Sequence, residues 1–291
     1  MDVSLIICTR NRAPQLTLCL AAVGAIRAQR DWEVIVVDNA SETSDTAEVA
    51  RAFAARASVP VQFVIEPCPG LAHGHNRGVA LARGRYLAFI DDDCYPAPDY
   101  IEALCAAFDG DPTLGYLSGR IMLHDPTDLA LTVNESLTPR VFPPRRYVQT
   151  GDVQGANMAF RSEVLAAIGG FDPWFGPGAP FNAEDIDAAA RANLYGWKGV
   201  YCPTIVVSHH HGRKPDEAAR IWRSYATGRG AYNMKLLLNG EFWWFARAIY
   251  GLRNRWKLSR GTIWYEQVGA ARYACMWLRA RFGQRRRAAV L

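Results

Sequence analysis

Short apolar segments alternate with amphipathic ones along roughly the first 120 residues. Residues between the apolar segments carry helix signals: Pro14 suits a first helical turn, Ser41 and Thr43 are N-cap candidates, and Gly84 suits a helix end. Strands that are apolar throughout and separated by helices predict a parallel sheet covered on both faces. The predicted strands cover residues 3–8, 32–37, 61–65 and 85–90.

Polar side chains follow three of these strands at their carboxyl ends. They are Thr9, Arg10, Asn11, Asp38, Asp91, Asp92 and Asp93. Ligands of such sheets bind at this edge, so we expect one site rather than unrelated loops. In an extended chain Asp91 and Asp93 share one face, and Asp92 points to the other. Two carboxylates on one face suit a hard divalent cation that also holds a phosphate, although an isolated pair is more often a solvated loop or a helix cap.

The stretch 121–211 is less regular and contains two further polar clusters. After a predicted short strand at 155–160 and a helix from Ser162 to Gly169, a third segment opens with Glu184 and Asp185. Acidic residues at a helix start also suit the helix dipole, so this cluster alone does not define a site. A predicted strand then leads to three successive histidines. His209 and His211 share a face there, and either is a candidate metal ligand.

The charge is distributed unevenly along the 291 residues. Residues 212–291 hold 17 Lys/Arg and 4 Asp/Glu, whereas residues 1–211 hold 16 and 24, so a net +5 combines a basic tail with an acidic body. The tail is predicted to be helical over 216–283, with breaks at Gly230, Gly240, Gly251 and Gly261. Its Trp and Tyr residues beside Arg suit an anionic membrane surface. A helical cap packed on the body is the alternative, and nucleic-acid binding explains none of the carboxylate clusters.

Cysteine usage and hydropathy indicate the compartment. Seven cysteines, an odd number with no Cys-x-x-Cys pair, favour reduced thiols and no zinc knuckle. No apolar run of 18 residues occurs, which predicts no transmembrane helix. The first residues read as a strand without a signal-peptide pattern. We therefore expect a cytoplasmic protein, peripheral on the inner face of the membrane.

Seven motifs, in order, together resemble family 2 glycosyltransferases of the GT-A fold. They are Cys8-Thr9-Arg10-Asn11-Arg12, Val36-Val37-Asp38-Asn39-Ala40-Ser41, Gly70 through Gly78, Gly84 through Asp93, Gly155-Ala156-Asn157, Gly169-Gly170-Phe171-Asp172 and Glu184-Asp185-x-Asp187. The resemblance covers about residues 3–230. It implies a nucleotide-diphospho-sugar transferase with a Rossmann-like mixed sheet. We expect a catalytic domain over residues 1–211, in which a nucleotide half and an acceptor half meet near residue 120. We expect a helical membrane-association region over residues 212–291.

The resemblance also implies roles for individual residues. Asp185 is the expected base, and Trp174 and Glu184 are expected on the acceptor side. Mn²⁺ or Mg²⁺ is expected at Asp93 and Asp91, with His209 or His211. The expected donor-binding residues are Thr9, Arg10, Asn11, Asp38, Asn76, Arg77, Asp91, Asp92 and Asn157.

Two departures from the family pattern affect these expectations. The first is His75, which stands where the family often has an arginine, so a basic role there passes to Arg77. The second is the absence of the Gln-x-x-Arg-Trp signature of processive synthases. We therefore expect a single-addition, inverting enzyme of polysaccharide or glycoconjugate synthesis. It would transfer a sugar from a nucleotide sugar, with UDP as the nucleotide, to a hydroxyl of a glycan or of a lipid-linked acceptor. The alternatives are a sugar nucleotidyltransferase, disfavoured because residues 8–12 lack glycine, and a non-catalytic membrane-bound scaffold.

Overall fold

A computed structural model describes residues 1–246 and 260–288 of the chain. The chain divides into two compact units. The first, which we call the sheet unit, contains residues 1–179 and 184–215, and the helical unit contains residues 180–183 and those from 216 onward. The residues expected to form the nucleotide and acceptor halves belong to the sheet unit, except for residues 180–183.

The sheet unit alternates strands and helices through its first half. Its elements are β1 (Val3–Thr9), α1 (Ala13–Val23), β2 (Trp32–Asn39), α2 (Asp45–Ala54), β3 (Val61–Glu66), α3 (Leu71–Leu81), β4 (Tyr86–Asp91), β5 (Cys94–Pro96), α4 (Tyr100–Asp109), β6 (Leu114–Leu123), β7 (Arg140–Phe142), the 3-10 turn η1 (Gly155–Asn157), β8 (Met158–Arg161), α5 (Ser162–Ile168), α6 (Glu184–Leu194), β9 (Lys198–His209) and the 3-10 turn η2 (Pro215–Glu217), which continues into the helical unit.

One mixed sheet runs in the order β3-β2-β1-β4-β8-β6-β9-β5, with β7 paired to β9. The first four strands are parallel, as predicted, whereas β8 is antiparallel to both β4 and β6. The register places Thr9 opposite Asp38 and Cys8 opposite Asp91. The polar residues that follow β1, β2 and β4 therefore meet at one edge of the sheet, as the sequence predicted.

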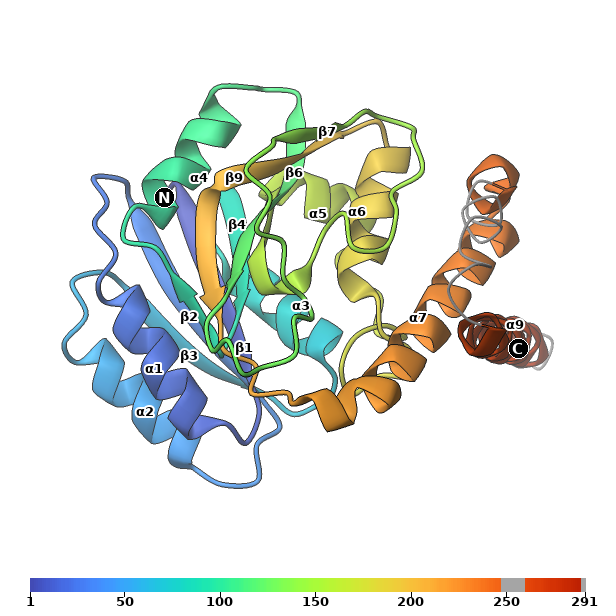
Figure 1. Ribbon diagram of the computed structural model, residues 1–291, viewed down its shortest axis with the longest axis horizontal. Coiled ribbons are helices and arrows are strands. Elements are labelled where there is room, and N and C mark those ends of the chain that lie inside the picture. Colours follow the sequence, from blue (N-terminus) through green and yellow to red (C-terminus); the bar gives the residue numbers. More distant parts are fainter. Residues whose placement is uncertain (247–259, 289–291) are drawn as a thin grey trace. The chain divides into compact units, whose positions relative to one another are not determined.

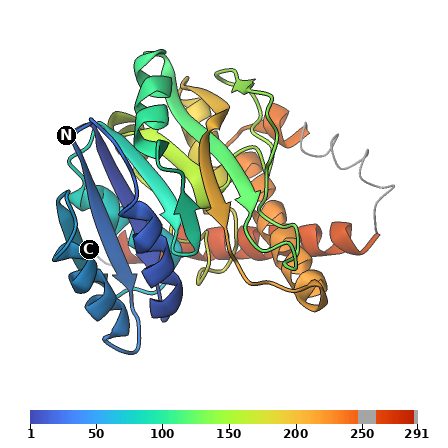
Figure 2. The ribbon, with the colours of Figure 1, turned by 60° about the vertical axis from the view of Figure 1, so that its left-hand side comes forward.

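Helices cover both faces of this sheet (Figure 1). Side chains of α1, α2 and α4 pack with one face of β1, β2 and β4 in a single apolar core cluster. On the opposite face α3 approaches so closely that a Cβ at Gly78 would lie 2.5 Å from Ile6. The turned view in Figure 2 shows the strands between these layers. Both faces of the central strands are buried, which explains why their sequences are apolar throughout.

Two local expectations were wrong. The second helix is preceded by Ser44, not by Ser41 or Thr43, and Ser44 makes no capping hydrogen bond to the backbone. The third helix ends at Leu81 with Ala82 as its C-cap, so Gly84 does not end it. Gly84 instead lies where β4 meets β1, and a Cβ there would lie 2.4 Å from the Ser4 backbone nitrogen. Close strand approach, not helix termination, explains this glycine.

The described part of the helical unit contains two long helices, α7 (Ala218–Leu238) and α9 (Arg260–Ala288). The predicted break at Gly230 is wrong because Gly230 lies inside α7, whereas Gly261 is the second residue of α9, next to residues that the structure does not describe. A Cβ on Gly230 would lie 1.9 Å from the Glu266 carbonyl oxygen, so this glycine lets the two backbones cross closely. Gly240 follows the end of α7 with φ 87°, as expected, and Gly251 lies outside the described residues.

No helix among residues 1–246 and 260–288 is both long and apolar enough to span a membrane. All seven cysteines are free thiols.

Candidate functional site

The acidic triplet lies between two strands of the sheet. Asp91 is the last residue of β4, and β5 begins at Cys94, three residues on. Because β5 pairs antiparallel with β9, Cys94 lies opposite His209, and the His210 amide donates to the Asp93 carbonyl at 2.9 Å. Strand pairing thus brings a histidine more than 100 residues away to the triplet.

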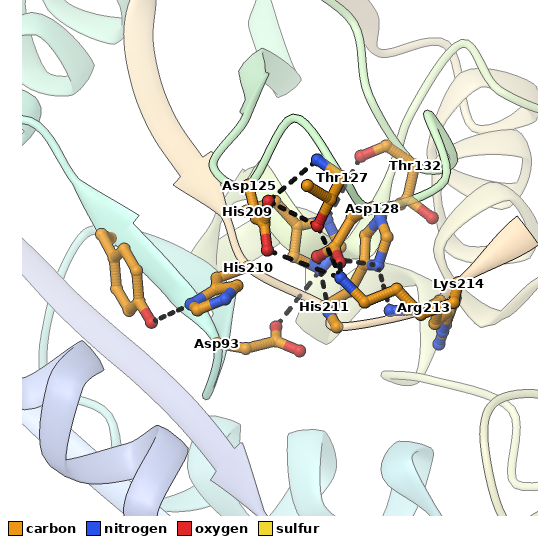
Figure 3. A network of polar contacts seen from close by, with 12 residues as sticks. Asp93, Asp125, Thr127, Asp128, Thr132, His209, His210, His211, Arg213 and Lys214 are labelled. Carbon is orange, nitrogen blue, oxygen red and sulfur yellow. Dashed lines mark hydrogen bonds and ion pairs between the residues drawn. The ribbon is translucent and has the colours of Figure 1, made fainter.

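Asp93 and His209 face each other at this point (Figure 3). The Nε2 atom of His209 lies 3.2 Å from Asp93 Oδ1, and among the described residues no other donor reaches this buried oxygen. The other oxygen, Oδ2, accepts from Arg12 at 2.6 Å. Burial alone would raise the Asp93 pKa, but His209 and Arg12 outweigh it and hold the pKa at about 2. Asp93 therefore stays ionised and presents Oδ1 to an imidazole nitrogen.

The second ring nitrogen of His209 determines how the imidazole is presented. His209 Nδ1 lies 3.3 Å from the Thr132 carbonyl oxygen, which can only accept a hydrogen bond. Nδ1 therefore carries the proton, and Nε2 directs its lone pair to Asp93 whenever the ring is neutral. A backbone carbonyl behind the ring is the usual arrangement for a metal-binding histidine.

Four potential ligand atoms, on Asp91, Asp93, Cys94 and His209, lie within 4.8 Å of one another. Mn²⁺ and Mg²⁺ prefer oxygen and nitrogen ligands to sulfur, so Cys94 is the weakest candidate of the four. Two carboxylates and one imidazole remain, a donor set that suits Mn²⁺ and, with fewer protein ligands, Mg²⁺. The Asp93 oxygen that faces His209 fits such a cation. This expected site is assembled with His209 rather than His211.

Asp92 is not one of these potential ligands, and it lies with Asp93 in the turn after β4, so the alternation of faces expected for an extended chain does not apply. It is buried, and its two oxygens accept from Thr9 at 2.7 Å and pair with Arg12 at 2.8 Å. Burial raises the Asp92 pKa to about 7, against the opposing charge of Arg12. Burial and the charge of Asp93 also raise the pKa of Asp91. Both expected donor contacts, Thr9 and Asp92, are thus joined to each other.

Asp185 opens α6 and lies within electrostatic reach of the triplet. Its oxygens accept the backbone amides of Gly155 at 2.9 Å and Ile186 at 2.7 Å. Burial raises its pKa to about 6, and the charge of Asp91 contributes in the same direction. A carboxylate with this pKa is ionised at neutral pH and basic enough to accept a proton. Asp187 instead pairs with Arg191 at 2.9 Å.

Asn76, Asn157 and Asp38, all expected at the donor, use their polar atoms within the protein. Asn76 donates to and accepts from the Phe171 backbone, both at 2.8 Å. Asn157 is fully buried and bonds two carbonyls and the Tyr100 hydroxyl. Asp38 accepts from Ser41 and Thr46. These contacts shape the loops around the site.

The remaining expected donor residues lie in turns at the sheet edge. Asn11, with φ 55°, accepts the Glu42 amide at 2.7 Å and so ties the turn after β1 to the turn after β2. Arg10 and Arg77 are exposed. His75, the departure from the family pattern, is buried between Phe89 and Phe171, and burial lowers its pKa to about 3. It is an uncharged core residue.

The two residues expected on the acceptor side differ in exposure. Glu184 is 7% exposed, and a Cβ at Gly155 would lie 3.6 Å from its Oε1 atom and 3.9 Å from Asp185 Oδ2. Glu184 and Asp185 therefore border the same glycine. Trp174 is half-buried, and its amide donates to Asp172 at 2.9 Å.

His211 lies beside His209 but interacts with another loop. Its ring centroid is 5.0 Å from that of His209, while its Nδ1 accepts the Arg213 amide and lies 3.8 Å from Asp128. The buried Asp128 carboxylate also accepts the Gly212 amide at 2.9 Å and Lys214 at 2.6 Å (Figure 3). Asp128 thus fixes the turn that follows His209.

A second group of potential ligands consists of Asp125, Asp128 and His210. Lys214 donates to Asp128 at 2.6 Å and lies 3.5 Å from Asp125, so an ammonium group already balances both carboxylates. His210 bonds the Tyr95 hydroxyl at 3.0 Å.

Sequence reasoning missed both Arg12 and Asp128. Arg12 lies within a recognised motif, but no motif marks Asp128.

Comparison with known proteins identifies the class. Residues 4–169 match the model of the family Glycosyl transferase family 2, so the chain belongs to this family, as its motifs predicted. It is 27% identical over 221 residues to the pre-mycofactocin glycosyltransferase of Mycobacterium tuberculosis, covering 72% of this chain and 43% of that protein. It is 32% identical over 208 residues to glycosyltransferase AglE of Haloferax volcanii, covering 71% and 66%. The chain therefore spans about half to two thirds of these relatives.

Solved structures share the fold. The mannosyltransferase PcManGT of Pyrobaculum calidifontis, in complex with GDP-Man and Mn²⁺, matches with a TM-score of 0.61 at 23% identity, covering 93% of this chain and 79% of that one. TarS residues 1–349 of S. aureus, in complex with UDP, matches with a TM-score of 0.60 at 16% identity, covering 79% and 65%. The fold is GT-A, as expected.

Proposed function

We propose that this chain is a metal-dependent inverting glycosyltransferase that moves a sugar from a nucleotide sugar to an acceptor hydroxyl. The arrangement of two groups carries the proposal. The Asp91–Asp93–His209 cluster offers cation ligands, and Asp185, with its pKa raised to about 6, lies separately at the start of α6. A cation site and a distinct base are the two groups that a single displacement requires.

The cation site would hold the donor diphosphate. Asp91, Asp93 and His209 are the proposed ligands, and a divalent cation bound there would neutralise charge on the departing diphosphate. Solved structures of the same fold contain GDP-Man with Mn²⁺ or UDP, which supports a nucleotide-sugar donor. We retain UDP as the proposed nucleotide, with Thr9, Arg10 and Asp38 at the base-binding end of the site.

Asp185 is the proposed general base. It would take the proton of the acceptor hydroxyl as the hydroxyl oxygen attacks the anomeric carbon. The bond from that carbon to the phosphate oxygen breaks, and its electron pair leaves with the diphosphate. The proton remains on Asp185, and one displacement inverts the anomeric configuration. The backbone amides of Gly155 and Ile186 hold the carboxylate in place for this step.

The acceptor is proposed to be a glycan or lipid-linked hydroxyl, with Trp174 and Glu184 beside it.

We further propose that the helical unit binds an anionic membrane surface from the cytoplasmic side. Trp222 and Trp264 on its long helices are 55% and 63% exposed, and Trp243, between the helices in the chain, is 86% exposed. Such aromatic residues in a basic segment suit a lipid headgroup layer.

The reaction itself tests the proposal. Purified protein is incubated with UDP- and GDP-sugars and a panel of glycan and lipid-linked acceptors, with Mn²⁺ or with EDTA, and the product anomer is assigned by NMR. Inverted product that forms only with a divalent cation supports the proposal. A retained anomer, or full activity in EDTA, contradicts it.

A liposome sedimentation experiment tests the proposed binding to a membrane surface. Salt-sensitive sedimentation with anionic but not neutral liposomes supports it, and equal sedimentation with both would contradict it.

A further inference from the structure

Arg12 connects two members of the acidic triplet. It lies in the turn between β1 and α1, and its side chain is 37% exposed. Its two terminal nitrogens reach different carboxylates, at 2.8 Å from Asp92 Oδ1 and 2.6 Å from Asp93 Oδ2. Thr9 donates to the remaining oxygen of Asp92 at 2.7 Å. A planar guanidinium with two short contacts fixes the rotation of both acceptors.

The two oxygens of Asp93 are thereby made different. Oδ2 is held by Arg12, whereas Oδ1 is buried and lies 3.2 Å from His209 Nε2. Each oxygen therefore has a different short contact, and the Arg12 contact at Oδ2 determines which oxygen faces His209.

We propose that Arg12 is a positioning residue for the cation site: through its bridge between Asp92 and Asp93, it turns Asp93 Oδ1 toward His209 and keeps it available to the cation. This inference rests on the proposed function, because it takes Asp93 and His209 as ligands. Asp92 has a role in it that the resemblance did not assign. It anchors the guanidinium.

Charge and position predict opposite effects of removing Arg12. If Arg12 acted only as a nearby positive charge, its loss would make the site more negative and tighten cation binding. If Arg12 positions Asp93, its loss frees the carboxylate to rotate and weakens binding. Partners behind a ligand typically contribute about 10- to 100-fold in metal affinity. The sign of the change therefore separates the two roles.

The experiment measures the affinity of the full chain for Mn²⁺ alone, by EPR of the free ion, for wild type, R12M, R12K and R56M. Arg56 is an exposed arginine that forms no ion pair among the described residues, so R56M is the matched control. We expect R12M to weaken Mn²⁺ binding by about tenfold or more. R12K keeps the charge but lacks the planar fork, and we expect it to weaken binding by about threefold or more. R56M is expected to match wild type.

Unchanged or tighter Mn²⁺ binding by R12M would overturn the proposal. Wild-type affinity in R12K would also overturn it, because a positive charge without the planar guanidinium would then be sufficient at this position. If R12M does not fold, R12K decides by the same criterion. Wild-type protein that binds no Mn²⁺ would refute the proposed metal dependence together with this inference. A change confined to R12M and R12K leaves the proposed function intact, so the two failures are distinguishable.

Discussion

His209 Nε2 lies 3.2 Å from Asp93 Oδ1, at the point where β5 pairs with β9. The two residues are 116 positions apart in the sequence. Their proximity depends on a three-residue strand, Cys94–Pro96, that places Cys94 opposite His209. Strand register, rather than a local motif, thus completes the proposed cation site.

This geometry distinguishes His209 from His210 experimentally. We predict that His209→Ala weakens Mn²⁺ binding by about tenfold or more, because one ligand is lost. His210→Ala is the control, since its ring bonds Tyr95 on the other side of the strand, and its affinity should remain within about twofold of wild type. Calorimetric titration with Mn²⁺ measures both. Equal losses in the two variants would contradict the assignment of His209.

Asp185 should set the acidic limb of the pH profile. Its pKa is raised to about 6, chiefly by burial, so protonation below that pH removes the proposed base. We predict that kcat/KM rises with pH through about 6 and then levels off. A cation that neutralises Asp91 would move this limb to lower pH, because the charge of Asp91 contributes to the raised pKa. Activity that is flat from pH 4.5 to 7 at constant fold would contradict the prediction.

His75 should make folding stability depend on pH. Its folded pKa is about 3, lowered by burial from 6.5, so the unfolded chain binds the extra proton between these values. Stability from this residue is complete above pH 6.5 and decreases as pH falls, by about 2 kcal/mol at pH 5. His75→Leu removes this dependence. Urea unfolding of both proteins at pH 5 and 7.5 measures it, and an identical pH response would be the contrary result.

Asp125 and Asp128 offer a matched comparison in the loop behind His209. Both lie near Lys214, but only Asp128 is buried and accepts the Gly212 amide. We predict that Asp128→Asn lowers the free energy of unfolding by about 1–3 kcal/mol, because a buried charged acceptor is lost. Asp125→Asn should change it by less than about 0.5 kcal/mol. Thermal or urea unfolding checks this, and a larger effect at Asp125 would refute it.

Much of the fold was predictable from local patterns. Residues 3–90 alternate apolar strands with helices, and every strand predicted there is present within a few residues. The shared edge of Thr9, Asp38 and Asp91 followed from the parallel arrangement alone. The ordered motifs identified the family, which the match over residues 4–169 confirms.

Other features depend on tertiary contacts that local patterns do not encode. The choice between His209 and His211 needed the β5–β9 register, because both share a face of the chain. Gly230 looked like a helix break, but close crossing with α9 explains it within an intact helix. Arg12 was visible in a motif, yet its bridge to Asp92 and Asp93 spans about 80 residues of chain.

The account depends most on Asp185 as the base. Asp185→Asn retains the shape and can still accept the Gly155 amide, so donor binding should persist while proton acceptance is lost. The most direct measurement is transfer from the nucleotide sugar by wild type and D185N, with the donor affinity of each measured by calorimetry in Mn²⁺. We predict a donor Kd within about threefold and turnover reduced by about 100-fold or more, as expected for loss of a general base. Turnover by D185N within a few-fold of wild type would contradict the account.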